Sequence, residues 1–203
     1  MQMKKVLVVS ANFPYGVQEE SFFDAEVESI GKSMELEFLP LHKGASALRA
    51  QRARHFISHI PNLRSRRQPL RYLRWIVVAF YFLVRDFSRD VAVCGFQNLI
   101  APKALAKRLK TFATISYWIC LIPDRCLDRN IDSIYSLWAT DIGYFAALLA
   151  RYHKRIAAVR FHRYDLYEDD GPVHMNRIFS SFSFVTCVFL TRGQADYLMG
   201  RTH

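Results

Sequence analysis

Short apolar runs alternate with amphipathic segments along most of the chain, and this alternation constrains the fold more than any other feature. Runs of this kind are typical of buried strands, and they cover residues 6–10, 36–41, 131–137, 156–161 and 184–190. Helical periodicity marks residues 20–32, 70–87, 98–110, 139–152, 172–181 and 192–199. Continuous apolar strands separated by helices are characteristic of parallel sheets. The sequence therefore predicts an α/β fold, a doubly wound, Rossmann-like parallel sheet with helices on both faces.

The length of the chain suits one domain. A chain of 203 residues with 51% hydrophobic and 23% charged residues can bury one core, and it is short for two ordinary domains with a linker. We expect a single domain over residues 1–203, with the basic stretch 43–68 as the one candidate for a mobile connection. The apolar run 6–9 is too short for a signal peptide, so we expect a cytoplasmic location.

The four cysteines show no pattern that predicts a metal site or a disulfide framework. Cys94, Cys120, Cys126 and Cys187 form no C-x-x-C pair and have no histidine at metal-ligand spacing. Carboxylate-rich metal motifs are absent as well. We therefore expect reduced thiols, no metal and no cofactor.

Positive charge is concentrated in one stretch of the chain. No acidic residue lies between Glu37 and Asp86. A positive field attracts anionic lipid or polyanions, and we predict peripheral contact with an anionic membrane surface, the inner face of the cell membrane. The residues expected to face the membrane are Arg49, Arg52, Arg54, Arg64, Arg66, Arg67, Arg71 and Arg74.

The apolar segment that follows this stretch is too short to cross a bilayer. Residues 75–84 are an uncharged run of ten, about half of the roughly 20 that a spanning helix needs. We interpret them as a core helix of the sheet, because so apolar a segment is usually buried. Nucleic acid is the least favoured partner, since the arginines are not interleaved with aromatic residues that would stack on bases.

Two loops follow predicted strands at the edge where open parallel sheets bind ligands. The first loop, 11–22, has a single glycine and no G-x-G-x-x-G or Walker pattern. It is interpreted either as a plain strand-to-helix turn shaped by Pro14 and Gly16 or as a ligand loop. Since both loops follow parallel strands, residues 11–16 and 161–165 should converge on one edge of the sheet.

The second loop, 160–168, is dense in polar side chains. His162 could donate a hydrogen bond to a sugar hydroxyl or a phosphate, and Asp165 could orient the loop or the imidazole. The alternative is that Asp165 caps the following turn and His162 is an ordinary strand-end residue. From the residues alone both interpretations stay open.

Several segments together resemble a known family. They are the first loop with the acid-rich helix after it, Tyr135–Trp138, residues 160–167 and residues 191–198. Taken in order along the chain, they are similar to the N-terminal domain of family 4 glycosyltransferases, of the branch that builds bacterial surface polysaccharides. The chain departs from the family pattern at Arg163, where the family often has glycine, and in the few glycines of the first loop.

This resemblance implies one half of a GT-B architecture and a retaining hexosyltransferase activity. It assigns catalytic roles to His162 and Asp165. It assigns substrate binding to Asn12, Phe13, Pro14, Tyr15, Gly16 and Arg163.

The resemblance also implies partners. This domain would hold a lipid-linked saccharide acceptor, and a nucleotide sugar would bind to a C-terminal domain. We expect that C-terminal domain to be absent from the chain, and the chain alone to be inactive. The competing interpretation is a non-catalytic module that binds a membrane or a polyanion.

Overall fold

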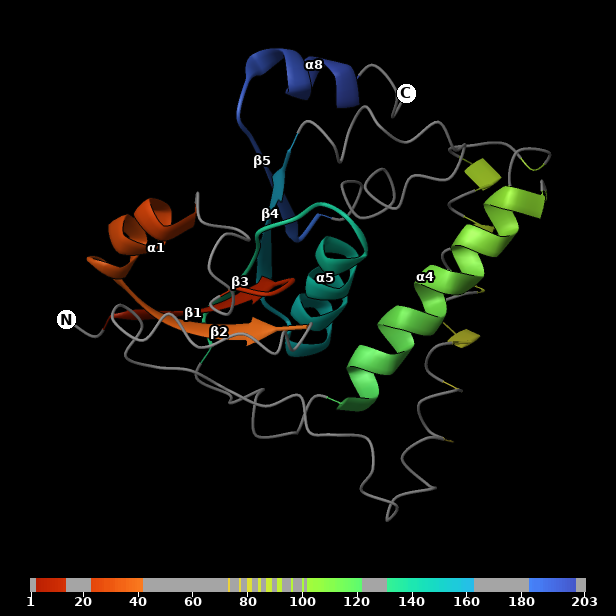
Figure 1. Ribbon diagram of the computed structural model, residues 1–203, viewed down its shortest axis with the longest axis horizontal. Coiled ribbons are helices and arrows are strands. Elements are labelled where there is room, and N and C mark those ends of the chain that lie inside the picture. Colours follow the sequence, from red (N-terminus) through yellow and green to blue (C-terminus); the bar gives the residue numbers. More distant parts are fainter. Residues whose placement is uncertain are drawn as a thin grey trace.

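The protein forms a five-stranded parallel sheet with helices on both faces, which confirms the predicted fold class (Figure 1). The computed structural model describes residues 3–13, 23–41, 102–121, 131–162 and 183–199, and eleven single positions between Leu73 and Ile100. The strands are β1 (Lys4–Ser10), β2 (Met34–Pro40), β3 (Ser133–Ser136), β4 (Ile156–Phe161) and β5 (Val185–Phe189). The helices whose bounds lie within the described ranges are α1 (Phe23–Gly31), α4 (Pro102–Leu121), α5 (Asp141–His153) and α8 (Arg192–Met199).

The strands lie in the order β2-β1-β3-β4-β5, and every neighbouring pair is parallel. β1 is an interior strand, and its run from Val6 to Ser10 is buried throughout, as expected for a strand covered on both faces. Its register pairs Val9 with Leu39 of β2 and with Ser136 of β3. The carboxyl ends of the strands therefore lie along one edge of the sheet.

Alternation along the strands sends side chains to two separate cores. On one face, Val6 and Val8 of β1 pack with Phe38 and with Phe23 of α1. On the other face, a larger cluster gathers Leu7 and Val9 with α5, α4 and β4. A side-chain period of two assigns successive residues of each strand to opposite faces, so both helical layers can cover the same sheet.

The larger core is built around α5, which lies between the sheet and α4 (Figure 1). Every residue of α5 from Ile142 to Ala150 is buried. The C-terminal half of α4 packs on α5 through two edge-to-face aromatic pairs, Phe112 with Tyr144 and Trp118 with Phe145. Lys154, in the left-handed conformation, caps the C-terminus of α5, and its N–H bonds to the carbonyls of Ala150 and Arg151. β4 begins two residues later.

Element bounds differ from the sequence prediction mostly at the ends. β4 and α8 were predicted with the bounds they have, whereas α1 is shorter than the predicted 20–32 within the described residues. Pro40 forms the last residue of β2, a position where a missing N–H is tolerated. The predicted helix 172–181 and the stretch 43–68 lie outside the described residues.

The interpretation of residues 75–84 as a buried core helix is wrong at each position of this run that the structure describes. Val77, Phe80, Tyr81 and Val84 have helical backbone, but each side chain is more than half exposed. High hydrophobicity predicts burial only if another element lies against the helix, and the chain does not cover these side chains.

Candidate functional site

The order of the strands singles out one point on the carboxyl edge of the sheet. From β1 the chain continues to β2 on one side, and β3 lies on the other side. This makes the gap between β1 and β3 a topological switch point, where the loops after the two strands diverge. Open α/β sheets bind ligands at such points. The candidate site is therefore built from the loops after β1 and β3 and from the end of β4.

Buried serine hydroxyls hold the first two loops against the strand ends. Ser10 Oγ donates to the backbone oxygen of Phe13 at 2.6 Å, and Ser136 Oγ donates to the backbone oxygen of Trp138 at 2.8 Å. Both serines are fully buried. A buried hydroxyl must find a partner, and here each one pins a carbonyl of its own loop. These bonds hold residues 11–13 and 137–138, which begin the two loops, against the strand ends at the switch point.

His162 ties the end of β4 to the loop after β3. Its Nε2 lies 3.1 Å from the backbone oxygen of Leu137, and the residue is 9% exposed. A carbonyl oxygen only accepts hydrogen bonds, so Nε2 carries the proton of this pair. The ring lies 4.7 Å from that of Trp138 and edge-on to Phe23 at 5.9 Å.

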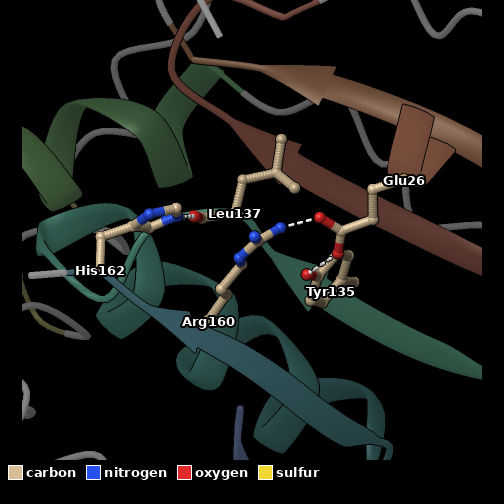
Figure 2. Close-up of polar contacts among 5 residues, drawn as sticks. All are labelled: Glu26, Tyr135, Leu137, Arg160 and His162. Carbon is tan, nitrogen blue, oxygen red and sulfur yellow. Dashed lines mark hydrogen bonds and ion pairs between the residues drawn. The ribbon is translucent and has the colours of Figure 1, made fainter. Parts of the chain in front are cut away.

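Three polar side chains meet beneath this ring, on the face of the sheet that α1 covers (Figure 2). Arg160 of β4 forms an ion pair with Glu26 of α1, and the Tyr135 hydroxyl donates to the other carboxylate oxygen at 2.5 Å. The Arg160 guanidinium also lies over the Phe23 ring, 5.3 Å from its centre. Glu26 therefore connects α1 to both β3 and β4.

Burial changes the acid–base behaviour of this cluster. Desolvation lowers the pKa of Arg160, because the cation has lost part of its hydration. Desolvation raises the pKa of Tyr135 to about 12, so the hydroxyl keeps its proton at neutral pH and acts as a donor. In this cluster Tyr135 keeps its proton, and Arg160 and Glu26 pair their charges. The cluster supports the surroundings of His162.

The expected convergence of the two loops is observed for the part that the structure describes. Phe13 belongs to the same core cluster as Phe23, and Phe23 contacts the His162 ring. Phe13 is itself buried, with its ring 5.3 Å from that of Phe38, and Asn12 is half-buried. Phe13 thus helps to build the support of the site, whereas Asn12 is the more accessible of the two.

Other expected site residues lie outside the described residues. They are Pro14, Tyr15, Gly16, Arg163 and Asp165, together with the eight arginines from Arg49 to Arg74. Within the part of the chain that the structure describes, no group of three histidine, cysteine or acidic side chains is placed to hold a metal ion.

Sequence reasoning missed Trp138, Glu26 and Arg160 as parts of the site. The period of two along β4 already places Arg160 and His162 on one face, and this signal could have paired them. Glu26 carried no such signal, because its approach to β4 depends on where α1 packs.

The chain was compared with protein-family models, with curated proteins and with solved structures. None of them matches.

Proposed function

We propose that this domain is the acceptor-side half of a GT-B glycosyltransferase, which holds a lipid-linked saccharide at the carboxyl edge of its sheet during retaining transfer from a nucleotide sugar. The observation that supports the proposal is the position of His162. It directly follows β4 near the switch point, and its ring packs on the loop that follows β3.

The hydrogen bond of His162 favours a neutral polyol over a phosphate. Because Nε2–H is donated to the oxygen of Leu137, Nδ1 of a neutral imidazole is the ring nitrogen that accepts hydrogen bonds. A sugar hydroxyl can donate to such a nitrogen, whereas a fully ionised phosphate offers no proton. We therefore assign His162 to a hydroxyl of the sugar.

Support for that assignment comes from the rigidity of the surroundings. The ring is held by the Leu137 oxygen and by Trp138 and Phe23, and Phe23 is in turn stacked on Arg160. A contact group held on several sides loses little freedom when a ligand binds, and pre-organisation of this kind improves both affinity and positioning.

Binding can be tested by NMR with the full chain labelled with 15N at histidine and tryptophan. The probes are short alkyl pyrophosphates that carry N-acetylglucosamine, glucose or galactose, and the same alkyl pyrophosphate without a sugar. We expect at least one sugar-bearing probe to shift the His162 and Trp138 signals, and the sugar-free probe to leave them in place. Equal shifts with and without the sugar would contradict the role of His162.

A pair of histidine variants provides the control. His162→Gln keeps an amide that can donate to the Leu137 oxygen but loses the ring acceptor, so we expect about tenfold weaker binding, the value of one hydrogen bond. His153→Gln changes a histidine at the far end of α5, and we expect unchanged affinity. Thermal unfolding of both variants separates a lost contact from a lost fold.

A further inference from the structure

A run of large apolar side chains is exposed in the chain just before and inside α4. Leu73, Val77, Phe80 and Val84 have helical backbone, and each is between 55% and 65% exposed. Their spacing of four, three and four residues is the one that places side chains on a single face of a helix. Ile100, two residues before α4, is also exposed.

The N-terminal half of α4 continues this exposure. Leu105 and Leu109 are 44% and 55% exposed, whereas Phe112 and Ile115, on the next turns, are buried against α5. Among the described side chains of α4, the large apolar ones in its C-terminal half are therefore buried or half-buried, whereas Leu105 and Leu109 in its N-terminal half are exposed. So many exposed apolar side chains close together in the sequence indicate a surface that another molecule or a membrane covers.

The net positive charge of the chain comes from the same part of the sequence. Residues 38–123 contain 15 lysines and arginines and two aspartates, a net charge of +13. The remainder of the chain contains 13 basic and 16 acidic residues, a net charge of −3. Lys103 and Lys110 of α4, on either side of Leu105 and Leu109, are exposed.

We propose that the exposed apolar side chains from Leu73 to Leu109 insert into the interfacial layer of an anionic membrane, with Lys103 and Lys110 of α4 beside the lipid head groups. The net charge of residues 38–123 attracts the chain to such a membrane. Apolar side chains flanked by lysine and arginine are the composition of helices that lie in the membrane interface. This surface is separate from the His162 site and does not depend on the transferase proposal.

A second copy of the chain fits the surface less well than anionic lipid. A symmetric dimer through these helices would bring two segments of net charge +13 together, and like charges across an interface oppose association. Anionic lipid head groups attract the same basic residues. Each basic group near the surface raises the affinity about fivefold.

The helices are expected to lie on the bilayer. None of the helices in the described ranges combines the length and the apolar character that crossing a membrane requires. Insertion of the exposed side chains to the level of the head groups is enough to cover them.

The test is co-sedimentation of the full chain with vesicles of phosphatidylcholine alone or with 30% phosphatidylglycerol. We expect binding to the anionic vesicles at 0.1 M salt, a loss of more than tenfold at 0.5 M salt because the charges are screened, and no binding to neutral vesicles. Equal binding to both vesicles, or none to anionic ones, would overturn the proposal.

Variants that keep every charge separate insertion from simple electrostatic adsorption. Phe80→Ser with Val84→Ser, and Leu105→Ser with Leu109→Ser, should each weaken binding at least tenfold. The matched control is Tyr152→Ser with Ile156→Thr, which removes two side chains of similar exposure, 71% and 59%, elsewhere in the chain. We expect the control to bind within twofold of the wild type.

Three results would refute apolar insertion. They are an unchanged affinity of the serine variants, an equal loss in the control pair, and a solution dimer that dissociates in the Phe80 and Val84 variant. The last would identify a second copy as the partner. Since a serine variant could lose its fold, Phe80→Trp and Tyr152→Trp give a second readout. Brominated lipids should quench the added fluorescence of the first and not of the second.

Discussion

Replacing Glu26 with glutamine should destabilise the protein through a single carboxylate that joins three elements. Glu26 pairs with Arg160 and accepts from the Tyr135 hydroxyl. Glutamine keeps an acceptor for Tyr135 and almost the same volume, so the change removes the charge and little else. Arg160 then remains as a cation in a region where burial already disfavours the charged form.

The size of the effect follows from the exposure of the pair. Breaking a fully buried ion pair costs about 3–5 kcal/mol, because one charge is left uncompensated. Here the Glu26 and Arg160 side chains are 27% and 15% exposed, so water screens part of the loss. We expect Glu26→Gln to lower the free energy of unfolding by about 2 kcal/mol.

A double-mutant cycle isolates the interaction. Arg160→Met removes the cation and keeps an apolar stem on Phe23, so we expect a smaller loss, about 1 kcal/mol. The double variant should lose about 2 kcal/mol, which is roughly 1 kcal/mol less than the two single losses together.

Urea unfolding at pH 7 measures these differences. Glu28→Gln is the matched control, because Glu28 lies two residues further along α1 and is exposed. Its effect should stay within about 0.5 kcal/mol. If Glu26→Gln matches this control, or if the losses in the cycle simply add, the cluster does not hold α1 on the sheet in the way we argue.

Three further predictions follow from groups whose pKa is shifted. Because the pKa of Tyr135 is about 12 in the folded state, against about 10 unfolded, the folded state holds the proton longer and stability should fall as pH rises from 10 to 12. Tyr135→Phe should lose less stability over that range in urea titrations. Burial, and then the charge of Arg155, lowers the pKa of His153, so the unfolded state binds more protons and stability should fall as pH drops below about 6.5. His153→Gln should flatten that slope between pH 7 and 5, and an unchanged slope would exclude His153 as its source. Burial raises the pKa of Cys187 to about 11, so iodoacetamide at pH 8 should modify it roughly a hundredfold more slowly in the folded than in the urea-unfolded chain. Peptide mass mapping measures that ratio.

Local features of the sequence were enough to predict the class of fold. A buried parallel strand needs a short continuous apolar run, and a helix beside it needs an amphipathic period, so 156–161 and 192–199 could be assigned with their observed bounds. The position of His162 directly after a strand also follows from the sequence. In a parallel sheet this places the residue at the ligand-binding edge.

The sequence did not determine which apolar side chains are buried. Phe80, Val84, Phe112 and Trp118 are all apolar residues of the kind found in core helices. Phe80 and Val84 are nevertheless exposed, whereas Phe112 and Trp118 are buried. The hydrophobicity of a side chain sets how favourable its burial would be. The packing of neighbouring elements decides which side chains are buried.

The sequence by itself therefore determined the elements, their parallel arrangement and the strand-end position of the candidate site. Only the tertiary structure decided that the switch point lies between β1 and β3, that Trp138 and Phe23 enclose His162, and that Glu26 meets Arg160. Secondary structure depends on patterns within a few residues, which a sequence displays directly. Strand order and cross-sheet contacts join residues more than a hundred positions apart, and they depend on how the whole set of elements packs together.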